Sequence, residues 1–588
     1  MLTDFLPTTK KEIELRGWDY VDIILFSGDA YVDHPSFGAA VIGRTLEAAG
    51  YRVASVPQPD WHGDYRDFRK LGRPRLFFAI SAGSMDSMVN HYTANRRRRS
   101  DDAYTPDGRP GMRPDYCTVV YSRILRDLFP DVPIVIGGIE ASMRRLCHYD
   151  YWQDKVLPSV LVDARADVLV YGMGEKPMLD LAKKAAEGES LKRCRQTAWL
   201  ANEEEARTIE GIRLHPFEKC VKDKRAYAEN YRHIEEQSNA WTSERLMEPC
   251  GKQVVVVEPS YPPMTTEEID HSFDLPYQRM PHPKYKGKTI PAYEMIRFSV
   301  CLHRGCFGGC AFCTIAAHQG KQVVSRSEES IMREVKALTL LPDFKGYLSD
   351  LGGPSANMYG MRGKDIERCK KCKRPTCLQP TICPNLNQDF TPLLQIYHRV
   401  DSMPEVKKSF IGSGIRYDLM SPEYAREVIL NHVSGRLKVA PEHTEPHVLK
   451  IMRKPPFSLF ERFCETFHRI NREAGLNQQI IPYFISSHPG CTMEDMAELA
   501  LKTKRLNFHL EQVQDFTPTP MTLSTVMYYT GLNPMTMEPV FVARSKEDKL
   551  RQRQFFFWYQ PEQQDAIRRN LNRIHRPDLA QKLLSKKR

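Results

Sequence analysis

Three closely spaced cysteines suggest a metal cluster in this 588-residue chain. Cys306, Cys310 and Cys313 are separated by three and then two residues in CLHRGCFGGCAFC, a segment that begins with Cys301. Thiolates are soft ligands, so three of them on one tight, glycine-bearing loop can hold three irons of a cubane. The fourth iron then lacks a thiolate from this motif and is open to a substrate or cofactor. Cys301 is interpreted as a bystander at a strand end, and a zinc loop or chance spacing is the competing interpretation.

A second cysteine group follows the first and predicts a further metal site. Four thiols lie within fifteen residues of ERCKKCKRPTCLQPTICPNL, namely Cys369, Cys372, Cys377 and Cys383. Four thiolates can close a tetrahedral zinc site or hold an auxiliary iron–sulfur cluster, and the spacing favours neither. Basic residues between the cysteines would compensate the thiolate charge. An unmetallated group of thiols is the remaining alternative.

Two alternating patterns of strands and helices surround the cysteine loop. Between residues 20 and 200, buried apolar strands such as YVDIILFSG alternate with helices such as AAVIGRTLEAAGY, which indicates a parallel, doubly wound α/β sheet. A second α/β pattern, from about residue 296, predicts a (β/α) barrel or part of one. The sequence therefore predicts four parts: a Rossmann-like domain (1–200), a connecting region (201–290), a partial barrel with a cysteine-rich insertion at 365–385 (291–525), and a basic, mostly helical extension (526–588).

Glycine and charged residues end several strands of the second pattern. DLGGPSANMYG places Gly352 and Gly353 after one strand, FIGSGIRYD places Arg416 after another, and RLKVAPEH places Glu442 after a third. The carboxyl ends of barrel strands lie at one face, where enzymes of this architecture have their active sites. Each of these signals is weak alone, and their weight comes from their order after the cysteine loop.

The cysteine loop, with the aromatic Phe312 just before its last cysteine, resembles the cluster loop of the radical S-adenosylmethionine (SAM) superfamily. That resemblance implies a [4Fe–4S] cluster on the three cysteines, with one iron open to SAM. It also implies cleavage of SAM to a 5′-deoxyadenosyl radical that abstracts hydrogen from a substrate, with electrons from a partner such as flavodoxin or ferredoxin. The residues that the resemblance assigns to SAM binding are Phe312, Gly352, Gly353, Arg416 and Glu442.

The likeness extends beyond the superfamily. CLHRGCFGGCAFC, DLGGPSANMYG, the cysteine-rich insertion, VAPEH and DFTPTPMT are together similar to the YgiQ family of radical SAM proteins, over nearly the whole chain. That family implies a cluster-bearing radical enzyme and leaves the substrate and the catalytic residues unidentified. Two alternatives stay open: an RNA-modifying enzyme similar to the methylthiotransferases, and a non-catalytic iron–sulfur protein that senses redox state or holds the fold.

The N-terminal pattern resembles the cobalamin-binding type of Rossmann module that precedes many radical SAM domains, and VIGG and YGMGE fit its late strands. In cobalamin users that supply a histidine below the cobalt, this His follows an Asp by two residues and precedes a Gly by three. Here Asp33 and His34 are adjacent, and Gly38 follows four residues later. The broken motif argues against cobalamin, so the domain is expected to be a scaffold or a substrate lid.

Charge and hydropathy restrict the remaining function classes. The formal net charge is +11, and residues 541–588 carry 13 Lys or Arg against 5 Asp or Glu. With the aromatic run in RQRQFFFWYQ, this basic tail is compatible with RNA binding or with a segment that packs onto the barrel. Mean hydropathy is −0.48, and the apolar runs are far shorter than the roughly 20 residues of a membrane span. The N-terminus resembles no secretory signal, so we expect a cytoplasmic protein outside the membrane.

Overall fold

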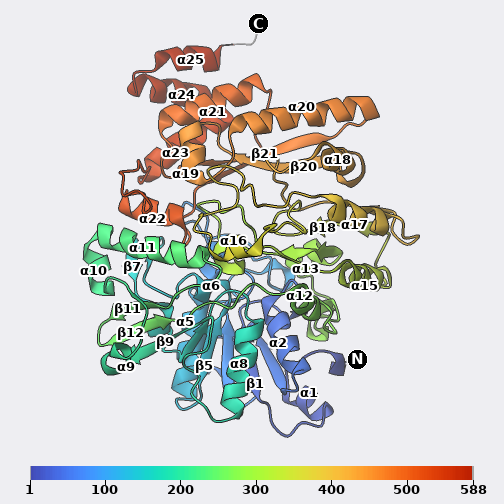
Figure 1. Cartoon of the computed structure of the whole chain (residues 1–588), viewed down its shortest axis with the longest axis vertical. Helices are drawn as coiled ribbons and strands as arrows, with labels where there is room; N and C mark the ends of the chain where they lie inside the picture. The colour runs from blue at the N-terminus through green and yellow to red at the C-terminus, as the bar shows by residue number, and fades with distance from the viewer. Residues whose placement is uncertain (1, 586–588) are drawn as a thin grey trace.

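A nine-stranded sheet forms the N-terminal half of the chain in the computed structural model, which describes residues 2–585 (Figure 1). The strands β3, β1, β4, β5 and β8 are parallel to one another, whereas the pairings of β8 with β9, β9 with β12 and β12 with β11 are antiparallel. In spatial order the strands are β10 (Ile212–Arg213), β11 (Leu246–Cys250), β12 (Gln253–Val257), β9 (Thr197–Asn202), β8 (Val168–Val170), β5 (Ile134–Gly137), β4 (Phe77–Ser81), β1 (Ile23–Ser27) and β3 (Val53–Pro57).

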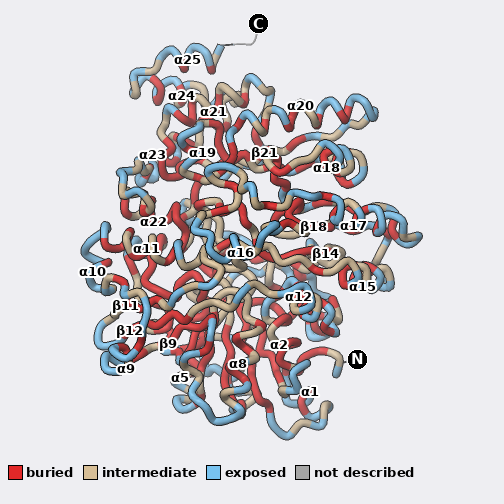
Figure 2. The backbone as a smooth tube through the Cα atoms, in the orientation of Figure 1, coloured by how far each residue is buried: buried red, intermediate tan, exposed pale blue. Residues whose placement is uncertain are grey.

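Both faces of this sheet are covered by helices, as the burial of β1 shows. Ile24 packs into a core with α5 (Cys117–Leu128), whereas its neighbour Ile23 packs into a core with α2 (Gly38–Ala48). Successive side chains of a strand point to opposite faces, so a strand that is apolar throughout needs cover on both sides. Figure 2 shows buried strands between helices whose outer surfaces are exposed. The predicted α/β class is confirmed.

Part of the segment that was expected to be a connecting region completes the sheet. β12 pairs with both β9 and β11, and its valines Val254–Val257 are buried. A two-residue turn joins β11 to β12, and Gly251 in this turn has a φ of +60°. The proline-rich sequence begins only after β12 and is followed by α12 (Thr266–Phe273), after which Tyr285 and Ile290 still pack in the N-terminal core. The structure therefore differs from the prediction for 201–290 because short apolar strands are embedded in a polar, charged segment.

The second unit, from residue 299 onward, is built on short parallel strands. β14 pairs with β18, β17 pairs with β19, and β20, β21 and β22 form a longer parallel group. These strands are β14 (Ser299–Cys301), β17 (Tyr347–Leu348), β18 (Asp350–Gly352), β19 (Lys408–Ser409), β20 (Arg436–Glu442), β21 (Gln479–Ser486) and β22 (Gln512–Asp515). The main helices between them are α15 (Glu328–Thr339), α17 (Thr391–Asp401), α18 (Pro422–Glu427), α20 (Phe457–Ala474) and α21 (Met493–Arg505). A partial barrel stays a prediction for this unit.

The basic C-terminal extension packs against the second unit (Figure 1). Its helices are α23 (Lys546–Gln554), α24 (Pro561–Arg573) and α25 (Pro577–Leu584). Phe555 and Phe556, from the aromatic run, are fully buried in the core of that unit. Buried rings serve packing and are not free to stack on bases, so the geometry favours the docking interpretation of this run. Within residues 2–585, no helix combines the length and the apolar character that crossing a membrane requires.

One helix near the C-terminus joins the two units. α22 (Leu523–Thr530) packs on α11 (Lys224–Asn239), whose apolar residues belong to the core of the N-terminal sheet. Tyr529 at the end of α22 stacks on Tyr149, with 4.6 Å between the ring centroids. Because late residues complete the early core, the two units form a single body.

Candidate functional site

The three cysteines of the first motif lie on a loop between β15 (His303–Arg304) and α14 (Ile315–Gln319). All three are partly buried, and the Cys313 N–H donates to the Cys310 carbonyl at 3.2 Å. Among the described residues, the Cys306, Cys310 and Cys313 sulfurs do not all lie within 4.8 Å of one another. Two thiolates on one zinc ion lie at most about 4.6 Å apart, because each Zn–S bond is about 2.3 Å. The three sulfurs are therefore spread more widely than the ligands of a single zinc ion would be.

A glycine allows the loop to turn tightly against the following strand, β16 (Val324–Ser325). Gly305 has a φ of +81°, and a Cβ atom there would meet the Gln322 carbonyl oxygen at 2.1 Å. Only glycine fits both the backbone conformation and the space at this position. The next residue, Cys306, donates its N–H to the Gly320 carbonyl at 3.2 Å. The position of the first thiol is thus fixed by local backbone geometry.

Two buried basic side chains lie beside the thiols. Arg416 donates from Nη1 to the Cys310 sulfur at 3.7 Å, and the rest of its guanidinium donates twice to Asp418, at 2.9 and 2.6 Å. Burial raises the pKa of the Cys306 thiol, and the charges of Arg416 and Lys454 oppose that rise. Burial, followed by the neighbouring thiols, also raises the pKa of the third cysteine of the motif, to about 12. Two cations at this place would offset the negative charge of ligated thiolates.

Glu442 ends β20 close to the same lysine. Its backbone has a φ of +67°, and only 9% of the residue is exposed. This conformation is uncommon for a residue other than glycine, and such strain is often found at functional sites. Burial raises the pKa of Glu442, and the charge of Lys454 opposes the rise. The structure thus gathers the cysteine loop, Arg416 and Glu442, and it adds Lys454, which sequence reasoning missed. The available signal was a basic residue before two prolines in MRKPPF, directly after α19 (Pro446–Met452).

The predicted glycine pair lies behind the loop and is packed against protein atoms. The Gly352 carbonyl accepts a hydrogen bond from the Leu302 N–H at 2.7 Å. A Cβ atom at Gly353 would meet the ring of His303 at 2.6 Å. This geometry uses the Gly352 carbonyl to join β14 and β18, whereas the resemblance implied a backbone contact to SAM. Small residues are needed here for the close approach of the two strands.

Phe312 lines a cavity between the two units, with a volume of about 620 Å³. Ser84 and Arg99 contribute to its wall from the N-terminal unit, and Asp515 contributes from the end of β22. Phe312 also makes an edge contact with the ring of His488, with 5.9 Å between centroids. Small-molecule sites occur preferentially at junctions of this kind. We refer to this space as the junction cavity.

A further cavity of about 460 Å³ lies at the carboxyl ends of the sheet strands, and we refer to it as the sheet-edge cavity. Gly83, Gly137 and Gly172 line it from the sheet, and Arg304 and His318 line it from the strand and helix that flank the cysteine loop. Open α/β sheets bind ligands at this edge. The Nδ1 atom of His318 is buried and has no hydrogen-bond partner within residues 2–585. The cavity is therefore lined by glycine backbone on one side and by the Arg304 and His318 residues on the other.

A buried ion pair connects the cysteine loop to the N-terminal sheet. Arg304, two residues before the first cysteine of the loop, pairs with Glu175 at the start of α8 (Glu175–Ala186). Ser272 also donates its hydroxyl to Glu175, at 3.0 Å. Burial alone would raise the pKa of Glu175, but the charge and hydrogen bond of Arg304 lower it below its usual value. Loss of the arginine would leave a buried carboxylate without its cation.

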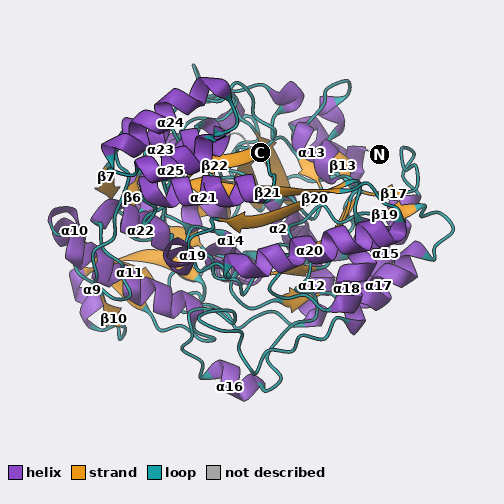
Figure 3. Cartoon of the chain, turned by 90° about the horizontal axis from the view of Figure 1, so that it is seen from above, coloured by secondary structure: helices purple, strands orange, loops and turns teal. Residues whose placement is uncertain are grey.

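The second cysteine group lies on the insertion that contains α16 (Ile366–Lys370). In Figure 3 this insertion projects beyond the helices of the second unit. None of its four cysteines forms a disulfide. Burial, followed by the other three thiols, raises the pKa of Cys377 to about 11. The four thiols therefore lie in one neighbourhood, as their spacing predicted.

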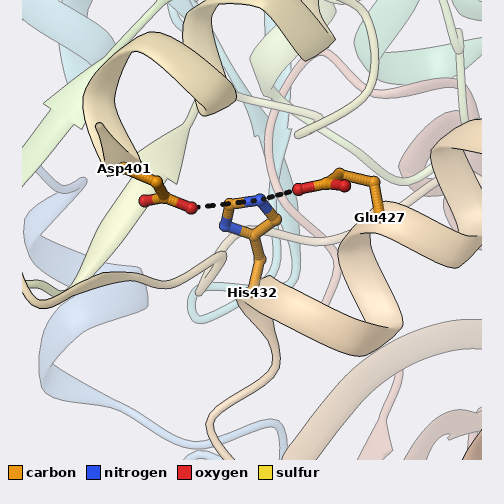
Figure 4. A group of neighbouring side chains, drawn as sticks. All are labelled: Asp401, Glu427 and His432. Atoms are coloured by element: carbon orange, nitrogen blue, oxygen red, sulfur yellow. Dashed lines mark hydrogen bonds and ion pairs between the residues drawn. The ribbon is translucent and has the colours of Figure 1, made fainter. Parts of the chain in front are cut away.

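A third group of ligand-type side chains was missed by sequence reasoning (Figure 4). His432 places Nε2 3.2 Å from Glu427 and 3.9 Å from Asp401, and its Nδ1 lies 3.0 Å from the Ser409 carbonyl. The three ligand atoms lie within 4.8 Å of one another, as ligands of one metal ion would. The same contacts are those of a histidine that lies between two carboxylates. Glu427 and His432 are five residues apart on the continuous helical stretch formed by α18 and the π-helical turn Val428–His432, whereas Asp401 ends α17, so no single local motif links the three.

The residues of the broken motif are held by other contacts. Asp33 pairs with Arg44. The His34 Nε2 lies 3.0 Å from Arg279, and its Nδ1 lies 3.1 Å from the Ser36 N–H. Burial, followed by the charge of Arg279, lowers the pKa of His34 well below its ordinary value. Both ring nitrogens are engaged, so His34 is not available as a ligand to cobalt.

Comparisons with known proteins agree with the class that the cysteine loop and the α/β fold define. Residues 5–299 match the family described as Radical SAM N-terminal, and residues 511–582 match a domain of unknown function, DUF3362. A UPF0313 protein of Bacteroides thetaiotaomicron is 64% identical, covering 100% of this chain and 99% of that protein. One from Porphyromonas gingivalis is 62% identical, covering 100% and 95%. The chain belongs to the UPF0313 family of radical SAM proteins, which confirms the predicted family.

A solved structure of similar fold corrects one prediction. TsrM, a radical SAM methyltransferase from Kitasatospora setae, was solved with cobalamin and a [4Fe–4S] cluster bound. It matches 87% of this chain and 74% of its own, with a TM-score of 0.51 and 15% identity, so the likeness concerns the fold. The prediction that argued against cobalamin was wrong, because this fold accommodates cobalamin beside an iron–sulfur cluster in TsrM. The broken motif around His34 removes one ligand and leaves the sheet-edge cavity intact.

Proposed function

We propose that this chain is a radical SAM enzyme in which Cys306, Cys310 and Cys313 hold a [4Fe–4S] cluster and leave one iron open to SAM. The observation that carries the proposal is the loop: its three partly buried thiols are spread too widely for one ion and lie beside two buried cations. When bound and reduced, the cluster supplies the electron that cleaves the sulfonium of SAM. A low-potential partner such as flavodoxin or ferredoxin would supply that electron.

The residues around the three thiols have different proposed roles. Arg416 is fully engaged by Asp418 and the Cys310 sulfur, so we assign it to the cluster and not to the SAM carboxylate. Glu442 is buried at a strand end and is the group assigned to bind hydroxyl or amino groups of SAM. Phe312, which directly precedes Cys313, lines the junction cavity and is assigned to the wall between that cavity and the cysteine loop.

The substrate would occupy the junction cavity. Its volume of about 620 Å³ falls in the range of roughly 300–1,000 Å³ that is typical of small-molecule sites. Asp515 and Arg99 give this cavity charged walls, which favours a polar small molecule. Phe555 and Phe556 of the aromatic run are buried in the protein core, so these two rings support no separate role in RNA binding.

Cobalamin would occupy the sheet-edge cavity. The glycine turns at Gly83, Gly137 and Gly172 let a flat ligand approach the backbone, and Arg304 and His318 line the opposite side of the cavity. Cobalamin supplies methyl-transfer chemistry when bound. We expect the chain to retain hydroxocobalamin through gel filtration and the variant Gly137→Leu to lose it. Absence of retention by the unmodified chain would overturn this assignment and leave the radical SAM proposal standing.

The product 5′-deoxyadenosine tests the central proposal. The protein is purified anaerobically, its cluster is reconstituted, and it is incubated with SAM and dithionite. We expect product from the unmodified chain and from Cys250→Ala, a partly buried cysteine outside both groups. We expect none from Cys306→Ala, Cys310→Ala or Cys313→Ala. No product from an intact, reducible cluster would refute the enzyme proposal and support a non-catalytic iron–sulfur protein.

A further inference from the structure

The cysteine-rich insertion is folded around its thiols. A Cβ atom at Gly363 would lie 2.2 Å from the Cys369 sulfur, so glycine makes room for that side chain. Asn385 donates from Nδ2 to the same sulfur at 3.3 Å, and the Arg374 N–H donates to the Cys372 sulfur at 3.4 Å. N–H donors directed at sulfur stabilise a thiolate more than a thiol. Polar N–H groups of the insertion are therefore directed at two of its four sulfurs.

Backbone hydrogen bonds bring the four cysteines together in two pairs. The Cys372 N–H donates to the Cys369 carbonyl at 3.1 Å, and the Cys383 N–H donates to the Cys377 carbonyl at 2.7 Å. The second of these bonds closes the loop between Cys377 and Cys383, and the hydrogen bond from Asn385 to the Cys369 sulfur connects the end of this loop to the first pair. All four thiols are free, so no disulfide explains their convergence.

The separation of the sulfurs distinguishes between a zinc ion and an iron–sulfur cluster, the two alternatives that the sequence left open. In the part of the chain that the structure describes, no three of these sulfurs lie within 4.8 Å of one another. The four ligands of one zinc ion would all satisfy that limit, because thiolates on a single zinc lie at most about 4.6 Å apart. A cluster separates its ligands further, since each thiolate binds a different iron. We propose that Cys369, Cys372, Cys377 and Cys383 bind an auxiliary iron–sulfur cluster of the [4Fe–4S] type.

This second site lies against the first. A Cβ atom at Gly309, next to Cys310, would meet the side chain of Thr376 at 2.7 Å, and Thr376 directly precedes Cys377. Gln379 of the insertion also donates to the Lys454 carbonyl at 3.3 Å. The auxiliary cluster would therefore stabilise the insertion at the place where it contacts the radical SAM loop and Lys454. The assignment of its ligands does not depend on the proposed function of the first cluster.

Metal analysis of two full-length proteins tests the proposal. The triple variant Cys306→Ala, Cys310→Ala, Cys313→Ala keeps the insertion and lacks the first site. After anaerobic incubation with ferrous iron and sulfide, we expect about four irons and about four sulfides per chain in this variant, against about eight of each in the unmodified protein. Adding Cys372→Ser and Cys383→Ser to the triple variant should remove this iron, whereas adding Cys250→Ser should not.

Each other outcome overturns the assignment. About one zinc per chain without sulfide would identify a zinc site. Iron that persists after Cys372→Ser and Cys383→Ser would show that these thiols are not its ligands. A triple variant that takes up neither metal while its circular dichroism matches the parent would show that the thiols are unmetallated. Because Cys372 is exposed, Cys372→Ser alone serves as a second variant that leaves the packing of the insertion unchanged.

Discussion

Arg416 provides a quantitative test of the cluster site. The proposal places its positive charge beside a ligand of the first cluster, since Nη1 lies 3.7 Å from the Cys310 sulfur. A positive charge stabilises the reduced, more negative cluster and raises its reduction potential. The double variant Arg416→Met with Asp418→Asn removes both charges of the pair, so no buried carboxylate is left without its cation. We expect this variant to have a lower potential.

The size of the shift follows from the geometry. Two unit charges 3.7 Å apart interact by about 4.5 kcal/mol at an effective dielectric constant of about 20. Asp418 accepts two hydrogen bonds from the same guanidinium and opposes its field, so we take about half of that value, about 2 kcal/mol. For a one-electron couple this is about 85 mV, because about 59 mV corresponds to a tenfold change in the equilibrium constant.

A potentiometric titration followed by electron paramagnetic resonance measures this shift. The signal of the first cluster is identified by its change when SAM is added. Arg416→Lys is the matched control, because it keeps the positive charge and loses the paired hydrogen bonds to Asp418. We expect a clearly smaller shift in this control. A double variant whose potential stays within about 20 mV of the parent would refute the reasoning, since the charge at Arg416 would then not reach the cluster.

Three predictions concern the stability of the fold. Arg304→Met leaves Glu175 buried without its cation and should lower the free energy of unfolding, measured by denaturant titration, by about 3–5 kcal/mol. A loss within experimental error would mean that the ion pair does not hold the cysteine loop to the sheet. Burial raises the pKa of Glu248 from 4.5 to about 7, so the folded state favours the protonated acid. As the pH rises from about 4.5 through 7, the free energy of unfolding should fall by about 3 kcal/mol more in the unmodified protein than in Glu248→Gln. Parallel pH profiles of the two proteins would contradict this. Phe556→Ala should lower the free energy of unfolding by about 3–5 kcal/mol, and replacement of the half-buried Phe557 by Ala should lower it clearly less. Equal effects would argue against docking of the tail through the Phe556 ring.

The cysteine loop could be predicted from sequence because its determinants are local. Its three thiols lie within eight residues, and the turn depends on Gly305 in the same segment. The α/β class was predictable for a similar reason, since the alternation of apolar strands and amphipathic helices follows from the local order of residues in the sequence. Features that depend on neighbouring residues were therefore recovered.

Contacts between distant segments could not be predicted. Arg416 reaches a sulfur 106 residues earlier, and a strand-end pattern does not say which ligand its side chain will face. The resemblance assigned this arginine to SAM, whereas its guanidinium is taken by Asp418 and Cys310. No motif in the sequence marks Lys454, and its position beside the loop is apparent only from the fold, which places the end of α19 there. The corrected prediction about cobalamin has the same cause, because a local motif around His34 was used to judge a cavity formed by many strands.

The cysteine loop lies where the hydrophobic cores of the two units meet. Phe307 is buried in the core of the second unit, Ala311 is buried in the core of the N-terminal unit, and Phe312 packs against both. The junction cavity and the sheet-edge cavity are also lined from both units. Each cavity therefore brings residues of the N-terminal unit next to residues of the second unit. Under the proposed function, a ligand in either cavity would contact the N-terminal unit as well as the segments that flank the cysteine loop, and Arg304, which joins the two units, would help to position that loop.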